Sequence, residues 1–214
     1  MTGDDDALLT TYAMLWEWRR RVAGLYAELR RTADPEAAWR LWRAERDRLF
    51  AGHPQTPLDP DRRAGFAGLD LFPYDPRFRF EVELEAPGDR SPVAAPAGAD
   101  GEVKLVPFAR TRGLAGALGG ELALYWIAGY GGGVFLPFRD ATSGAGTYAG
   151  GRYLLDTIKG ADLGVRDGRV VLDFNFAYNP SCSYSGRWAC PLAPAANRLP
   201  RLVTAGERAG VTEA

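Results

Sequence analysis

The spacing of apolar residues changes along the chain, and its first part has a helical period. Between residues 5 and 31, apolar side chains recur every three or four positions, which predicts a helix with one buried stripe. That stripe comprises Leu8, Leu15, Trp18, Val22, Leu25 and Leu29, with Thr11 at the missing step. A second helix is indicated by Asp34 as N-cap, Pro35 in the first turn and Gly52 just past the end. Its stripe comprises Trp39, Trp42, Arg46, Leu49 and Phe50.

After Pro76 the period becomes two, which is typical of half-buried strands. We expect strands at residues 78–84, 103–108, 111–118, 121–128, 134–138 and 148–155. Gly119-Gly120 predicts a hairpin turn, and Asp167-Gly168 predicts a type I′ turn between two further strands. Strands that follow one another without helices between them indicate antiparallel pairing. The sequence therefore predicts an α+β fold: mainly an antiparallel β barrel or sandwich over residues 53–214, with an N-terminal helical hairpin over residues 1–52 packed on it.

Composition narrows the class of protein. The 214 residues suit one domain with a helical appendage, and the hydrophobic content of 46% is enough for a substantial core. A net charge of -1 gives no field that would attract nucleic acid or an anionic membrane. No run approaches the ~18 apolar residues of a membrane span, and the acidic start lacks the order of a signal peptide. We therefore expect a soluble, cytoplasmic protein with neither nucleic acid nor membrane as a partner.

The sequence does not favour a dinucleotide-binding site, a histidine-dependent catalytic site or a zinc site. The glycine-rich stretch 144–149 is followed by a predicted strand, whereas a dinucleotide fingerprint must open a helix. His53 is the single histidine and lies where a capping or loop-anchoring role is commoner than catalysis. Cys182 and Cys190 are too few for a zinc site, so reduced thiols are the first expectation and a conditional disulfide the second. We expect neither a metal nor a cofactor.

The strongest candidate site is a group of polar side chains among glycines in the last third of the chain. As candidates for acid–base catalysis we select Asp140, Tyr148 and Tyr153. As candidates for ligand binding we select Arg139, Arg152, Asn175, Tyr178, Asn179 and Asn197. Asp173 and Asn175 would share one face of a strand and Leu172, Phe174 and Phe176 the other. The alternative interpretation is an internal network of Arg–Asp and Asn–backbone bonds that holds long loops in place.

These residues favour a site for a small polar or anionic molecule, because arginine offers a planar donor fork and glycine-rich connections between strands commonly carry sites. The sequence leaves open whether a reaction follows binding, which ligand is bound and which oligomer forms. The alternative, from another class, is a non-catalytic interaction module that uses the tryptophan-rich helical hairpin. Burial of Trp16, Trp39 and Trp42 within the monomer would argue against that alternative.

We also expect residues 175–198 to form a long ordered loop over one end of the β domain. Its prolines interrupt ladders and helices, while the aromatic rings of Tyr178, Tyr184 and Trp188 need burial. Such a loop would bring Cys182 and Cys190 near each other, whether or not they are bonded.

An ordered series of motifs runs through the chain: RLFAGHPQTPL, FAGLDLFPYDPRFRF, FLPFRD, TSG, TY-x-GGRY, LDFNFAYNPSC, W-x-CPLAP and NRLP. The series resembles the family called domain of unknown function 1684, and the resemblance extends from about Leu15 to Glu207. One departure is Ala149, where the family usually has glycine. The resemblance implies no particular activity, because the family carries none that can be transferred.

Overall fold

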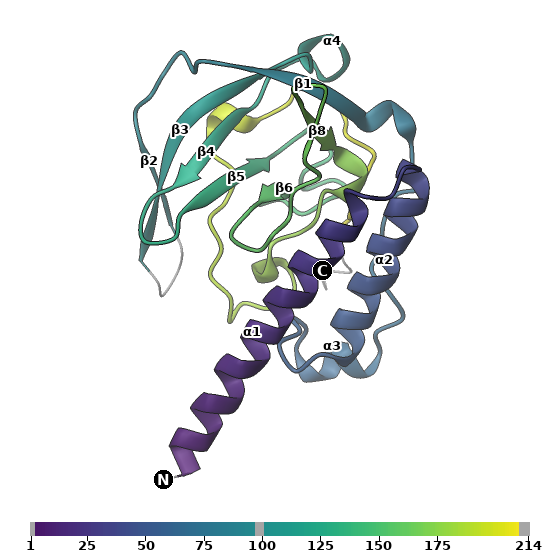
Figure 1. Ribbon diagram of the computed structural model, residues 1–214, viewed down its shortest axis with the longest axis vertical. Coiled ribbons are helices and arrows are strands. Elements are labelled where there is room, and N and C mark those ends of the chain that lie inside the picture. The colour runs from purple at the N-terminus through teal and green to yellow at the C-terminus, as the bar shows by residue number, and fades with distance from the viewer. Residues whose placement is uncertain (1–2, 97–100, 210–214) are drawn as a thin grey trace.

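The computed structural model describes residues 3–96 and 101–209, with side chains from Leu8 onward. It has the predicted α+β architecture, in which two long helices lie beside an antiparallel sheet curled into a half-barrel (Figure 1). None of the described helices combines the length and the apolar composition that crossing a membrane requires.

The two helices form the predicted hairpin. Helix α1 spans Gly3–Leu29 and α2 spans Pro35–Gly52, with the Asp34 side chain accepting a hydrogen bond of 3.0 Å from the Glu36 amide. The predicted stripe of α2 is buried, but only the second half of the α1 stripe is, since Leu25 and Leu29 are covered and Leu8 is 55% exposed. Helix α1 has 27 residues against 18 in α2, and its first turns extend beyond the body of the molecule (Figure 1).

The sheet joins eight antiparallel strands in the order β6-β5-β4-β3-β1-β8-β7, with β2 paired to β3. The strands are β1 Arg79–Glu85, β2 Val93–Pro96, β3 Glu102–Arg112, β4 Ala123–Ile127, β5 Gly133–Phe138, β6 Arg152–Asp156, β7 Val165–Arg166 and β8 Arg169–Asp173. Strand β1 pairs with β8 through its first four residues and with β3 through its last three. This exchange of partners within one strand contributes to the curl of the sheet.

Short helices complete the chain: α3 Pro60–Ala64, α4 Ala115–Leu118 and the 3₁₀ turns η1 Pro76–Phe78, η3 Phe174–Phe176, η4 Ser181–Ser183 and η5 Ala195–Asn197. Segment 175–198 is therefore built of 3₁₀ turns joined by irregular chain, with Tyr178 and Tyr184 buried.

The predicted strand at residues 111–118 is wrong, and so is the hairpin turn at Gly119-Gly120. Strand β3 ends at Arg112, and the Glu121 carboxylate then accepts hydrogen bonds of 2.9 Å from three consecutive amides, which start α4. Gly119 has φ of 80° and caps the end of α4. The type I′ turn is confirmed, because Asp167 and Gly168 have φ of 50° and 76°.

Tertiary packing joins the hairpin to the sheet through one shared core. Trp42 is 1% exposed and its ring centroid lies 5.3 Å from that of Phe176. Its indole N–H donates to the Tyr26 hydroxyl at 3.1 Å, and the Trp39 indole donates to the carbonyl of Asn175 at 3.1 Å. A second part of the core lies between the sheet and the C-terminal segment, where Leu199, Val203 and Ala205 are buried.

Candidate functional site

Two of the predicted site residues form a buried ion pair. Asp140 follows β5 and Arg152 begins β6, and their charged atoms lie 2.9 Å apart with both side chains at most 1% exposed. The two terminal nitrogens of Arg152 also donate to the carbonyls of Val203, Ala205 and Glu207, while its buried Nε has no partner among the described residues. Asp140 also accepts from the Val203 amide at 3.1 Å. Burial lowers the pKa of Arg152. The pair thus ties the C-terminal segment to the sheet.

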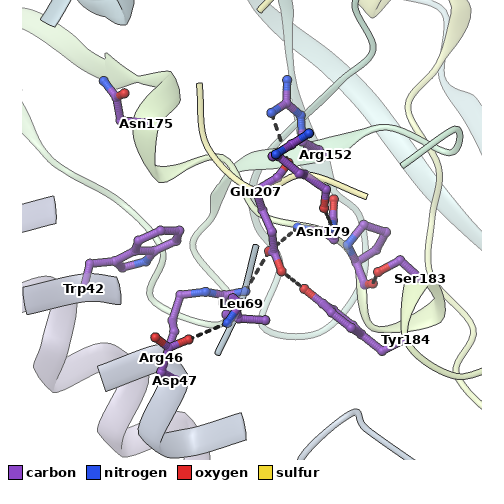
Figure 2. A network of polar contacts seen from close by, with 12 residues as sticks. Trp42, Arg46, Asp47, Leu69, Arg152, Asn175, Asn179, Ser183, Tyr184 and Glu207 are labelled. Carbon is purple, nitrogen blue, oxygen red and sulfur yellow. Dashed lines mark hydrogen bonds and ion pairs between the residues drawn. The ribbon is translucent and has the colours of Figure 1, made fainter. Parts of the chain in front are cut away.

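A neighbouring network centres on Glu207, which sequence analysis did not single out (Figure 2). Its carboxylate accepts hydrogen bonds from the Arg46 guanidinium at 3.0 Å, from the backbone amide of Asn179 at 2.9 Å and from the Tyr184 hydroxyl. Burial raises the pKa of Glu207, against the opposing effect of Arg46. A signal was present in the sequence, because Arg46 lies on an otherwise apolar helical stripe and so requires a buried partner.

The two remaining asparagines bind backbone. Asn175 exchanges hydrogen bonds of 2.9 Å with both backbone groups of Asp75. Asn197 does the same with Ala123 at 2.8 Å and donates also to the Pro137 carbonyl. Strand β8 ends at Asp173, and Asn175 lies in a 3₁₀ turn, so the expected alternation of Asp173 and Asn175 with the apolar residues on two faces of a strand does not apply. The side chains of Asp173 and Asn175 are both buried.

Tyr178 and Tyr153 lie side by side near the end of β6. Tyr178 is buried, pairs with Tyr153 through two backbone hydrogen bonds, and has the Arg46 guanidinium 5.0 Å from its ring centroid. The Tyr153 hydroxyl donates to the Pro191 carbonyl at 2.6 Å, and burial raises its pKa. Both rings therefore anchor the segment that follows β8.

Tyr148 belongs to a half-buried cluster with the two cysteines. Its hydroxyl contacts the Cys182 sulfur at 3.6 Å, and burial raises the pKa of Tyr148 to about 12. Cys182 and Cys190 are free thiols in hydrogen-bond contact, which confirms that the ordered segment brings them together. The positive charge of Arg139 opposes this rise in the pKa of Tyr148. Of the three predicted catalytic residues, the structure thus places Tyr148 and Tyr153 near the thiols and Asp140 in the ion pair.

Three arginines converge on a cleft between the α1–α2 turn and the β7–β8 hairpin. Arg30, Arg79 and Arg166 line it, above a floor that includes Phe176 and Val171, and its volume is about 80 Å³. None of the predicted ligand-binding residues lines this cleft. The arginines come from the turn after α1, from β1 and from β7, so no local sequence pattern predicts that they line one cleft.

His53 has the anchoring role that its position favoured. Its Nδ1 accepts from the Gln55 amide at 3.0 Å, while its Nε2 lies 2.6 Å from a Glu17 carboxylate oxygen. Hydrogen bonds from His53 and Arg21 lower the pKa of Glu17, outweighing the opposite effect of burial. Within the described residues, no three His, Cys, Asp or Glu side chains are grouped so that they could hold a metal ion.

Comparison with known proteins gives a family but no activity. The model of the family of proteins of unknown function DUF1684 matches residues 64–208, and the chain belongs to this family. An uncharacterized protein of Haloarcula marismortui, solved in solution by NMR, is 35% identical; the match covers 80% of this chain and 92% of that one, with a TM-score of 0.53. A search of the curated proteins finds no match.

Proposed function

We propose that the protein binds a small anionic molecule, through its phosphate or carboxylate group, in the cleft lined by Arg30, Arg79 and Arg166. The observation that carries the proposal is that three arginines, and no acidic residue, line one concave surface. Guanidinium groups bind phosphate and carboxylate oxygens in a planar, bidentate geometry.

The pairing of these arginines leaves much of their donor capacity free. Arg79 lies 3.4 Å from Asp173, and Arg166 lies 3.8 Å from Glu81, both longer than a good charged hydrogen bond. Burial raises the pKa of Asp173, against the opposing effects of its bonds to Asn175 and of Arg79. Arg30 gives one N–H to the Asp162 carbonyl at 2.6 Å and has others to offer.

The size of the cleft limits the ligand. A volume of about 80 Å³ holds several water molecules or one small anionic group, but not a whole nucleotide. The apolar floor formed by Leu29, Val171 and Phe176 would contact the non-polar part of a ligand such as a short dicarboxylate.

Calorimetric titration with inorganic phosphate and with succinate, at constant ionic strength, tests the proposal and separates the two ligand groups. Arg166→Gln is expected to raise Kd about tenfold, equivalent to ~1.4 kcal/mol. This is the low end of the effect of a charged hydrogen bond, because the Arg166 side chain is 53% exposed.

Arg169→Gln is the matched control, since Arg169 pairs with Arg166 across the same hairpin but does not line the cleft. Removing its charge should change Kd by less than about twofold, because salt screens charges beyond the contact shell. Absence of binding by both anions, or equal effects of the two variants, would contradict the proposal.

The site residues predicted from the sequence differ in their relation to this cleft. The hydrogen bonds of Asp140, Arg152, Asn175, Asn179 and Asn197 go to other groups of the protein. Among the described residues, the buried Nε of Arg152 and Oδ1 of Asn179 have no partner. Arg139 and Tyr148 are only half-buried, and their part in ligand binding or acid–base chemistry stays a prediction.

A second candidate function, association through the helical hairpin, is favoured by the exposed face of α1. Trp39 and Trp42 are buried, but Leu8, Tyr12 and Trp16 are 55%, 66% and 66% exposed at intervals of four residues. We propose a second copy of the chain as the partner. Antiparallel pairing of two such helices about Tyr12 sets Leu8 of each copy opposite Trp16 of the other.

Light scattering over a range of concentrations tests this association. The chain is expected to form a dimer that Trp16→Glu converts to a monomer, because the substitution puts a charge in the centre of the apolar face. Trp126→Glu, at an exposed tryptophan on β4, should leave the dimer intact. A wild-type chain that stays monomeric at all concentrations would refute the second candidate.

A further inference from the structure

Cys182 and Cys190 form a contacting thiol pair that the proposed anion site does not use. Cys182 lies in the 3₁₀ turn η4 and Cys190 just before Pro191, with seven residues between them. Their side chains hydrogen-bond to each other, and both are half-buried rather than sealed in the core. The chain between them is irregular, so joining the sulfurs would break no strand pairing.

The surroundings of the two sulfurs differ. Hydrogen bonds from the Cys182 thiol and from the backbone amides of Cys182 and Ser181, together with the charge of Lys159, lower the pKa of Cys190 to about 6, although burial opposes this. The bond to Cys190 and burial raise the pKa of Cys182. These contacts favour the thiolate at Cys190 and the protonated thiol at Cys182.

Neighbouring phenols hold the pair in position. The Tyr148 hydroxyl lies 3.6 Å from the Cys182 sulfur, and the Tyr153 hydroxyl fixes Pro191, the residue after Cys190, through its carbonyl at 2.6 Å. Each cysteine is therefore oriented from outside its own segment.

We propose that Cys190 and Cys182 are a redox-active dithiol that exchanges with small-molecule disulfides such as glutathione disulfide. The Cys190 thiolate attacks one sulfur of the disulfide, forms a mixed disulfide and releases one glutathione thiolate. Cys182 then loses its proton to water and attacks the Cys190 sulfur, which releases the second glutathione. The protein has lost two hydrogens and formed one disulfide, and the small disulfide has been reduced to two thiols.

The reactive segment is linked to the loop that follows α2. Arg187, between the two cysteines, donates to the Thr56 carbonyl at 2.9 Å, and Arg62 donates to the Tyr184 carbonyl at 3.1 Å. Formation of the disulfide would therefore reduce the flexibility of a segment that contacts the loop after the C-terminus of α2.

Intact-mass spectrometry after treatment with glutathione disulfide tests the inference. Wild type is expected to lose two hydrogens and keep no adduct, whereas Cys182→Ser should retain one glutathionyl group on Cys190. At pH 6, Cys190→Ser should react about tenfold more slowly than Cys182→Ser, because its remaining thiol is mostly protonated. That advantage should shrink as pH rises, since a thiolate of low pKa is intrinsically the weaker nucleophile.

A persistent adduct on wild type, or faster reaction of Cys190→Ser than of Cys182→Ser at pH 6, would overturn the inference. In Cys182→Ser the serine hydroxyl can still donate to Cys190, and near-UV circular dichroism checks that each serine variant is folded. Alkylation of wild type by iodoacetamide, mapped by peptide mass, should label Cys190 with a midpoint near pH 6; labelling of both cysteines only above pH 8 would contradict the assignment.

Discussion

Replacing Arg152 by methionine is expected to lower the free energy of unfolding by about 3–5 kcal/mol, because it leaves the Asp140 carboxylate buried without its counter-charge. The side chains of the pair are at most 1% exposed, so water cannot replace the lost donor. The carbonyls of Val203 and Ala205 lose their donors as well. The whole domain of the Arg152→Met variant should therefore unfold at a lower denaturant concentration than the wild type.

Urea unfolding followed by circular dichroism measures this effect. Arg198→Met is the control, since Arg198 is an exposed arginine of the same C-terminal segment, and it should change stability by no more than about 0.5 kcal/mol. Equal, small effects of the two substitutions would show that the Asp140–Arg152 pair does not hold the C-terminal segment.

Trp42→Ala is expected to cost about 3–5 kcal/mol, the range for removing a large buried aromatic side chain. Trp42 contacts Phe176 after β8 and carries Arg46 over its ring at 5.0 Å, so its loss opens a cavity between α2 and the sheet. Trp42→Phe should cost less, because it mainly removes the bond to the Tyr26 hydroxyl.

Trp16→Ala provides a control of the same residue type in the monomer. At a protein concentration low enough to dissociate the proposed dimer, it is expected to change stability by no more than about 0.5 kcal/mol, because Trp16 is 66% exposed. Thermal unfolding of the three variants at one protein concentration distinguishes the cases. A loss of stability in Trp16→Ala as large as that in Trp42→Ala would mean that the exposed half of α1 is packed in solution.

The elements with local signals could be predicted from the sequence. Helix α2 begins at Pro35 because Asp34 caps it, and the β7–β8 hairpin forms because Asp167 and Gly168 both adopt positive φ. Helix α4 could not be predicted, because the residue that caps its N-terminus follows the helix in the sequence. The Glu121 carboxylate accepts hydrogen bonds from the three backbone amides at the start of α4. A cap supplied by a later residue produces no periodic pattern of apolar residues in the sequence.

The candidate site was harder to predict for the same reason. Polar residues concentrated in the last third did indicate a network, and Arg152 with Asp140 is its central pair. The arginine-lined cleft, however, takes Arg30 from the turn after α1, Arg79 from β1 and Arg166 from β7, and only the folded chain brings them together. In a chain where nearly all basic residues are arginine, no one of them stands out by type.

The claim that the cleft formed by Arg30, Arg79 and Arg166 binds a small anion is tested most directly by the NMR signals of the arginine side chains. The Nε–H signals of these three residues should shift on titration with inorganic phosphate or succinate at constant ionic strength, along one common saturation curve. The Nε–H signals of Arg169 and Arg112, which lie outside the cleft, should stay in place. Linear shifts without saturation, or equal shifts at all exposed arginines, would contradict the account.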